Sequence, residues 1–191
     1  RRAASACVDV GAHMIMLDVN DQSLADMQTL MTREGVTSFK LFMAYPGVLM
    51  LDDGALFKAM RLAGRHGAMI CVHAENGQVI QVLVEEAVAA GQLGPKYHSL
   101  TRPPSMEGEA THRAITIATL AETPLYVVHL SAREALRAVM EARDAGLPVY
   151  AETCPHYLFL TQEAYDHPGF ESAKYVMTPP LRDLQHQQAI W

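Results

Sequence analysis

The stretch Ser38-Phe39-Lys40-Leu41-Phe42 decides the fold, because its residues alternate between two kinds of environment. Successive side chains of a β-strand point to opposite faces, so Lys40 lies opposite to Phe39 and Leu41. If the two apolar residues face covering helices, the lysine faces the interior of a curved parallel sheet. The stretch therefore predicts a strand that carries Lys40 on its inner face.

Similar short runs recur along the chain and alternate with segments whose apolar residues recur at intervals of three and four. This alternation is typical of βαβ units around a parallel sheet. Strands are predicted near 7–17, 36–43, 68–74, 124–130, 148–153 and 174–178, and helices near 21–34, 53–66, 76–91, 107–121 and 131–145. Ser131 is predicted to cap the helix that follows it. The long connection 91–105 is expected to serve function or an interface.

The rhythm of these units matches a (β/α)8 TIM barrel, which needs eight strands and typically about 250 residues. Six predicted strands in 191 residues cannot close such a barrel. The chain opens directly into a predicted strand and stops within a helix-like run. We therefore expect an α/β fold that is an incomplete barrel, with an open doubly wound sheet as the alternative.

Composition argues against several functional classes. The 15 Lys and Arg against 21 Asp and Glu give a net charge of −6, which provides no basic surface for nucleic acid. No apolar run reaches the roughly 18 residues of a membrane span. Cys7, Cys71 and Cys154 are odd in number and far apart, which favours reduced thiols over a disulfide framework. We expect a cytoplasmic protein that binds neither nucleic acid nor membranes.

Three predicted strands carry a titratable residue near the carboxyl end, where barrel enzymes place their chemistry. Alternation puts His73 on the face of Cys71, and it puts His129 on the face of Val127. Each residue alone has an ordinary explanation, as a hydrogen-bonded core histidine or a lysine whose amine reaches solvent. Together with Lys40 they predict two imidazoles and one amine at a single mouth.

Burial of an unpaired ammonium is costly and lowers the pKa of a lysine. The neutral amine can react with carbon dioxide, and the carbamate that forms is an anionic oxygen ligand able to bridge two divalent metals beside imidazole nitrogens. Lys40, His73 and His129 therefore predict a metal site. The other histidines are expected to be structural (His13, His66) or solvated (His98, His112, His167, His186), and a supporting role at the site is the less favoured alternative for His156.

Six stretches carry a more specific signal. They are Ser38-Phe39-Lys40-Leu41-Phe42-Met43-Ala44-Tyr45, Val72-His73-Ala74-Glu75-Asn76-Gly77, Leu100-Thr101-Arg102-Pro103-Pro104, Val128-His129-Leu130-Ser131-Ala132, Glu152-Thr153-Cys154-Pro155-His156-Tyr157-Leu158 and Thr178-Pro179-Pro180-Leu181-Arg182. In this order the chain resembles the dihydropyrimidinase and D-hydantoinase family of cyclic amidohydrolases. The resemblance implies that residues 1–191 are the central part of one TIM-barrel catalytic domain, about strands 2 to 7. The first and last strands and a small β-domain then lie outside the chain.

The same resemblance implies ring opening of dihydropyrimidines or hydantoins to N-carbamoyl amino acids by a homotetrameric hydrolase. Lys40 resembles the carboxylated lysine (N6-carboxylysine, formed with carbon dioxide) that bridges two divalent metal ions, most often zinc. His73 and His129 resemble two histidine ligands of the second metal. Tyr45 resembles the tyrosine that binds substrate and donates to the oxyanion, and Thr178 stands where the family often has a serine that contacts the substrate ring.

The resemblance also implies a His-x-His pair that is expected before Arg1 and an Asp that is expected after Trp191. In the complete protein two cations lower the pKa of a bridging water, and the hydroxide attacks the ring carbonyl. The metal and Tyr45 stabilise the oxyanion, while the Asp carries the proton to the leaving nitrogen. We expect the 191 residues alone to be inactive.

Two other readings remain open. A non-catalytic scaffold of the same fold, like the collapsin response mediators, has lost its metal ligands, and the trio of Lys40, His73 and His129 argues against it. Allantoinase and dihydroorotase share the metal chemistry and differ in substrate. An arginine clamp for a substrate carboxylate favours dihydroorotase, and the sequence alone places none at this mouth.

Overall fold

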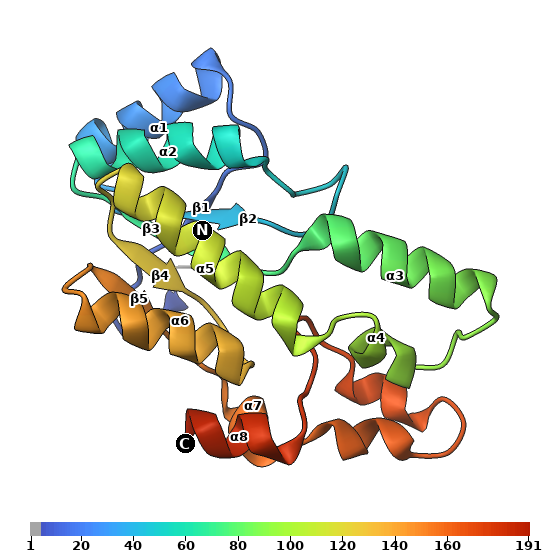
Figure 1. Ribbon diagram of the computed structural model, residues 1–191. Helices are drawn as coiled ribbons and strands as arrows, with labels where there is room; N and C mark the ends of the chain where they lie inside the picture. The colour runs from blue at the N-terminus through green and yellow to red at the C-terminus, as the bar shows by residue number, and fades with distance from the viewer. Residues whose placement is uncertain (1–4) are drawn as a thin grey trace.

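The structure is a computed structural model that describes residues 5–191 (Figure 1). The strands are β1 (Met14–Ile15), β2 (Ser38–Phe42), β3 (Met69–His73), β4 (Leu125–Val127) and β5 (Val149–Ala151). The helices are α1 (Asp21–Arg33), α2 (Asp53–Arg65), α3 (Gly77–Ala89), α4 (Lys96–Leu100), α5 (Pro104–Leu120), α6 (Arg133–Asp144), α7 (Pro155–Phe159) and α8 (Leu184–Ile190), with 3-10 helices η2 (Gln162–Asp166) and η3 (Glu171–Tyr175). None of the described helices is both long and apolar enough to cross a bilayer.

The five strands form one parallel sheet in the order β1-β2-β3-β4-β5. Neighbours in space are thus neighbours in sequence, and each pair is joined through at least one helix, as in the wall of a barrel. The register aligns Lys40 with Cys71 and Tyr126, and it aligns Phe42 with His73. The expected fold class, a partial (β/α) barrel, is confirmed.

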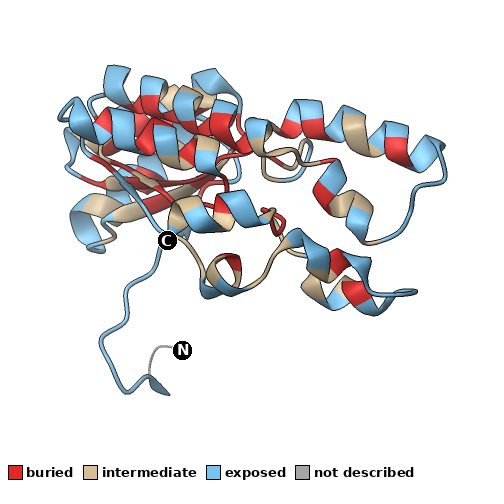
Figure 2. Cartoon of the chain, turned by 60° about the horizontal axis from the view of Figure 1, so that its bottom comes forward, coloured by how far each residue is buried: buried red, intermediate tan, exposed pale blue. Residues whose placement is uncertain are grey.

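The core lies between one face of the sheet and the helices. Phe39, Leu41, Ile70 and Val72 are fully buried there, and α1, α2, α5 and α6 lie side by side over them. Figure 2 shows the buried residues gathered between these layers. Alternation therefore sends the residues between them, Lys40 among them, to the opposite face of the sheet, as the sequence predicted.

The helix starts show which backbone groups needed side-chain partners. The side chain of Asn20 accepts from Ser23 N at the start of α1, and the side chain of Asp52 accepts from Ala55 N at the start of α2. The start of α6 differs, because Ser131 does not cap it as predicted. The capping acceptor is a carboxylate from α5.

That carboxylate belongs to Glu107, which is buried and accepts from Ser131 N at 2.7 Å and from Ala132 N at 3.1 Å. The Ser131 hydroxyl donates to the same carboxylate at 2.5 Å. A long-range partner of this kind leaves no local sequence signal.

Two of the six predicted strands are wrong in part or in full. The first is reduced to Met14–Ile15, and residues 5–13 are exposed on one side of the molecule (Figure 2). Residues 174–178 form the end of η3 and an extended segment instead of a strand. The main chain of that segment forms its hydrogen bonds outside the sheet. The Met177 carbonyl accepts from the His98 side chain, and Val176 N donates to the Ala173 carbonyl in the 3-10 turn.

Candidate metal centre at the carboxyl ends of the strands

Two imidazoles meet where β3 and β4 end. His73 is the last residue of β3 and only 1% exposed, and its Nδ1 lies 3.1 Å from Nε2 of His129. The two rings are 4.8 Å apart between centroids at an angle of 67°. The predicted convergence of these histidines is confirmed.

The way in which His129 reaches this place differs from the prediction. Leu125 and Val127 face the helical core, while Tyr126 pairs with Cys71 on the other face. Alternation alone would send His129 to the side of Val127, away from the mouth. The strand ends at Val127, and the φ of +43° at His129 turns the imidazole back toward β3. This backbone conformation is uncommon for a residue other than glycine and often marks a functional position.

Glu75 orients the first imidazole, and sequence reasoning missed it. Its Oε2 lies 2.8 Å from Nε2 of His73, and both side chains are buried. A carboxylate accepts here, so Nε2 carries the hydrogen and the lone pair of the His73 ring lies on Nδ1, toward His129. The second oxygen, Glu75 Oε1, is buried without a hydrogen bond. The spacing of two residues, which puts both side chains on one side of an extended segment, was the available signal.

The second imidazole is held in its neutral form. Burial, together with the nearby His73 and Lys40, lowers the pKa of His129 to about 3. Its Nδ1 is buried and makes no hydrogen bond within residues 5–191. A neutral imidazole with a lone pair is the form that binds metal.

Lys40 lies on the same face of the sheet as the imidazoles, two residues before the end of β2. Its Nζ is 5.0 Å from the centre of the Phe42 ring, and its charge reaches far enough to lower the pKa of His129. Burial lowers the pKa of Lys40 to about 8, opposed by Cys71 and Glu152. At that value roughly a tenth of the amine is neutral at pH 7. The structure thus confirms the predicted face and the predicted direction of the pKa shift.

Tyr45 lies against the ring of His73, in the loop after β2. Its ring lies 5.2 Å from that of His73, and its carbonyl accepts from three main-chain N–H groups of residues 48–50. The φ of +68° at Tyr45 belongs to this tight turn. Burial raises the pKa of Tyr45, while a hydrogen bond with Thr178 opposes the shift. The two predicted substrate-contacting residues therefore lie together, although they are far apart in sequence.

His98 holds the Thr178 segment, and the expectation that it is solvated is wrong. Its Nε2 lies 2.8 Å from the Met177 carbonyl and 3.3 Å from Thr178 Oγ1. A carbonyl only accepts, so Nε2 carries the hydrogen. Burial lowers the pKa of His98, and the neighbouring Arg102 adds to the effect. The two elements meet only in the folded chain, so no local pattern indicated the contact.

A second histidine is also misplaced by sequence reasoning. His186 is 2% exposed, and its Nδ1 accepts from the main-chain N–H of Arg133 at 3.0 Å. It joins α8 to the start of α6 and lies outside the candidate site. His112 and His167 are exposed, as expected. The ring of His156 packs edge-to-face against that of Tyr157, with 4.2 Å between the ring centroids, and His156 is the last of the groups that lower the pKa of His129.

Within residues 5–191, no three His, Cys, Asp or Glu side chains gather at a spacing that fits one metal ion. The site that the structure assembles consists of two imidazoles, a lysine with a lowered pKa, a tyrosine and a threonine. A lysine becomes a ligand of the hard, anionic type only after carboxylation.

The sequence and the structure were compared with known proteins. No family model matches the chain. It is 52% identical over 187 residues to a D-hydantoinase of Streptomyces coelicolor and 38% identical over 190 residues to a dihydropyrimidinase of Arabidopsis thaliana. These matches cover 98% and 99% of this chain but 40% and 36% of the relatives.

Solved structures give the same result. A crystal structure of dihydropyrimidinase from Brevibacillus agri superimposes with a TM-score of 0.95 at 48% identity, over 99% of this chain and 41% of that one. The chain thus spans about two fifths of the length of the relatives it matches. With its partial barrel and this level of identity, the chain belongs to the D-hydantoinase and dihydropyrimidinase family.

Proposed function

We propose that the protein hydrolyses the cyclic amide bond of hydantoins or dihydropyrimidines, opening the ring to an N-carbamoyl amino acid, with the help of divalent metal ions. The observation that carries this proposal is the pair of imidazole nitrogens 3.1 Å apart on the same face as Lys40. The similarity to D-hydantoinases and a dihydropyrimidinase supports the substrate class.

The donor set fits a metal ion. Two nitrogens bound to one tetrahedral zinc at roughly 2.0–2.1 Å lie about 3.3 Å apart, close to the 3.1 Å between His73 Nδ1 and His129 Nε2. Lys40, once carboxylated, would supply an anionic oxygen ligand. Bound divalent ions would polarise the ring carbonyl and lower the pKa of water.

The residues of this chain have distinct tasks in that reaction. Glu75 holds the hydrogen of His73 on Nε2 and so keeps the Nδ1 lone pair toward the metal position. Tyr45 is protonated at neutral pH because burial raises its pKa, so its hydroxyl can donate to the oxygen that develops negative charge. Thr178, held by His98, presents a hydroxyl that can bond the ring and orient it.

The test uses the full-length protein with 5-phenylhydantoin and dihydrouracil as substrates. We expect ring opening that a chelator abolishes and zinc restores, with bound metal measured by elemental analysis. Mass spectrometry of the native protein should show one added carbon dioxide on Lys40. A protein without metal, without this added mass and without turnover would instead be a scaffold of the same fold.

A further inference from the structure

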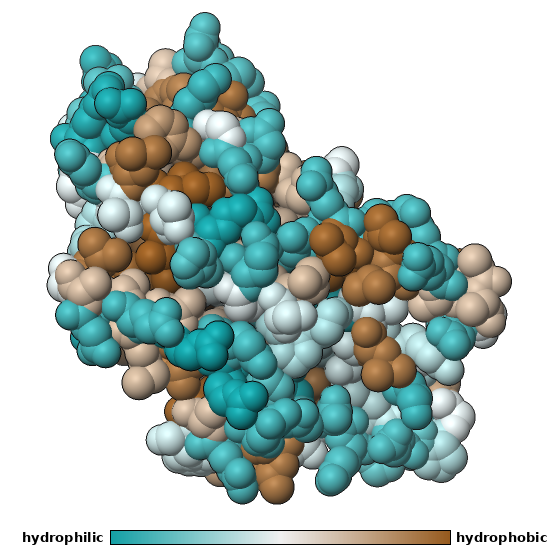
Figure 3. Space-filling model, in the orientation of Figure 1, coloured by the Kyte–Doolittle hydropathy of each residue, from teal (hydrophilic) through white to brown (hydrophobic). Residues whose placement is uncertain are grey.

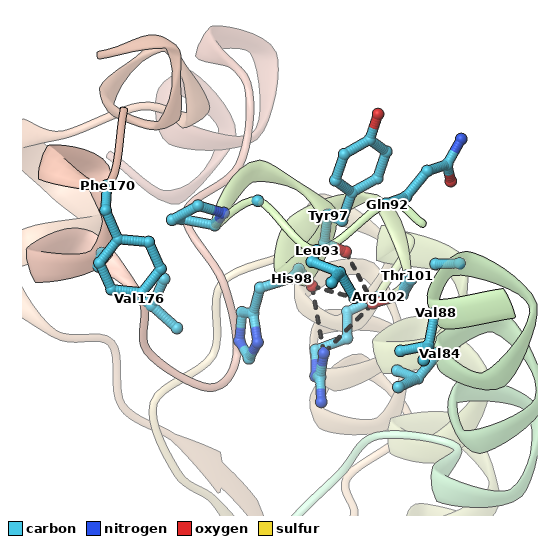
Figure 4. A pocket seen from close by; sticks show the side chains of 14 residues that line it. Val84, Val88, Gln92, Leu93, Tyr97, His98, Thr101, Arg102, Phe170 and Val176 are labelled. Atoms are coloured by element: carbon cyan, nitrogen blue, oxygen red, sulfur yellow. Dashed lines mark hydrogen bonds between the residues drawn. The ribbon is translucent and has the colours of Figure 1, made fainter. Parts of the chain in front are cut away.

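A cavity of about 460 Å³ opens between α3, α4 and η3, beside the candidate metal centre. Its walls are mostly apolar and include Val84, Val88, Leu93 and Phe170 (Figure 4). Leu93 and Phe170 are 70% and 76% exposed, and Figure 3 shows apolar surface over α3. Its volume is within the range of small-molecule sites, about 300–1,000 Å³.

One cationic side chain interrupts these apolar walls. Arg102 is half-buried, and its Nη1 donates to the His98 carbonyl at 3.2 Å and to Thr101 Oγ1 at 3.3 Å. In the part of the chain that the structure describes, Nε and Nη2 make no hydrogen bond and no carboxylate pairs with Arg102. A desolvated guanidinium with free donors is suited to a bidentate anionic partner.

The cavity is connected to the candidate metal centre through His98. This imidazole lines the cavity next to Arg102, and its Nε2 lies 3.3 Å from Thr178 Oγ1. The negative charge of Glu75 also reaches Arg102, since it raises the pKa that burial lowers. The guanidinium therefore lies between the apolar cavity and the residues proposed to handle the ring.

We propose that Arg102 and this cavity form a subsite for a carboxylate that is attached to an apolar body. The inference rests on the proposed function and deepens it. Hydrolysis adds water across the amide: the C–N bond breaks, a C–O bond forms, the nitrogen takes one proton, and the new acid loses the other. A neutral ring thus becomes a carboxylate, and the ring-opened product is the first source of this chemistry. A ring that carries a carboxylate substituent, such as dihydroorotate, is the second source.

The experiment measures binding to full-length protein stripped of metal, because a metal ion also attracts carboxylates. The probes are N-carbamoylphenylglycine and its carboxamide, which share the apolar body and differ in charge. In calorimetry we expect wild type to bind the acid about 10- to 100-fold more tightly than the amide, as charge-assisted hydrogen bonds allow. Arg102→Met should remove this preference, and Arg102→Lys should keep part of it. Arg137→Met, at an exposed position on α6, is the matched control and should bind like wild type.

A second variant tests the apolar wall without touching Arg102. Phe170→Ser should weaken the binding of N-carbamoylphenylglycine several-fold and leave the binding of N-carbamoylglycine unchanged. Dihydroorotate distinguishes the two sources: a larger loss for dihydroorotate than for N-carbamoylphenylglycine in Arg102→Met assigns the subsite to the substrate, and the reverse assigns it to the product. Equal binding of acid and amide by wild type, or an unchanged preference in Arg102→Met, would overturn the inference. Absence of 5-phenylhydantoin turnover by the metal-loaded protein would instead overturn the proposed function.

Discussion

The sheet region, residues 14–151, and the segment that follows it, residues 154–183, position their site residues by different means. In the sheet, apolar burial and parallel pairing fix the positions of Lys40 and His73. The later segment has only a small core, made of Tyr157, Tyr165 and Leu181. There the tyrosine hydroxyls bond main-chain groups, as in the contact of Leu181 N with the Tyr165 hydroxyl at 3.0 Å.

This difference has a physical cause. A strand gains its hydrogen bonds from its neighbours, so its side chains are free to be apolar on one face and reactive on the other. The segment without a strand must satisfy its main-chain groups through side chains. A mutation in the sheet should therefore affect either stability or chemistry, whereas one in the segment should affect both.

The sharpest test of this separation compares neighbours on opposite faces of β2. Lys40→Ala should reduce turnover of 5-phenylhydantoin by the full-length protein to background and leave the unfolding free energy of the metal-free protein almost unchanged, because it removes a partly desolvated amine. Leu41→Ala should lower that free energy by about 2–5 kcal/mol, since Leu41 is fully buried. The fraction of Leu41→Ala that remains folded should turn over normally. Denaturant unfolding of the metal-free proteins and steady-state kinetics of the metal-loaded ones make the comparison, and large losses of both properties in both variants would contradict it.

A network of hydrogen bonds around Glu107 joins the two regions. Glu107 on α5 accepts from Arg182 Nη2 at 2.9 Å and from Ser131, so one carboxylate links the loop of His129 to the Thr178 segment. Glu107→Ala would leave the buried guanidinium of Arg182 without a carboxylate, and we expect a loss of about 3–5 kcal/mol in unfolding free energy.

The matched control is the exposed pair between Arg137 and Glu141 on α6. Glu141→Ala should cost less than about 1 kcal/mol, because such surface pairs contribute little. Similar losses for Glu107→Ala and Glu141→Ala would show that the network does not hold the two regions together.

The same comparison explains what the sequence could predict. Strands β2 and β3 and helices such as α1 and α2 carry regular periodicity, so they could be located. Residues 7–13 and 174–178 have β-rich composition, but in the described structure they pair with no neighbouring strand. A composition signal indicates only that a segment can be a strand, whereas pairing decides whether it becomes one.

The site divides in the same way. Lys40 and His73 lie within regular strands, where alternation gave the correct face. His129 lies beyond the end of β4, and its position depends on a positive φ that no period describes. The contacts of His98 and Glu107 join residues far apart in sequence, so they could be found only in the folded chain.

Substitution of Glu75, in the sheet region, should have a smaller effect, on metal affinity. Glu75→Gln keeps an acceptor for His73 Nε2 but removes the negative charge beside the imidazole. Changes at such second partners of metal ligands typically cost about 10- to 100-fold in metal affinity, and we expect the lower end because the hydrogen bond can persist. Chelator competition on the full-length protein measures the change, with Glu85→Gln on the exposed side of α3 as control. Equal zinc affinity in both variants would show that Glu75 does not contribute to metal binding at the site.

The smallest expected change in stability comes from a substitution in the later segment. The buried hydroxyl of Tyr157 donates to the Pro179 carbonyl at 2.6 Å, so Tyr157→Phe should lower the free energy of unfolding by about 1 kcal/mol at pH 7.

The same tyrosine makes this difference depend on pH, because burial raises the pKa of Tyr157 above its usual value near 10. Above pH 10 the unfolded tyrosine loses its proton before the folded one does, so the folded state holds more protons and its stability falls as the pH rises. Phenylalanine does not titrate. The difference in free energy of unfolding between wild type and Tyr157→Phe should therefore decrease above about pH 10, by up to ~1.4 kcal/mol per pH unit. If this difference stays constant from pH 7 to 11, the Tyr157 hydroxyl is not buried against the Pro179 carbonyl. Other contacts would then have to hold Thr178, the residue before Pro179, in place.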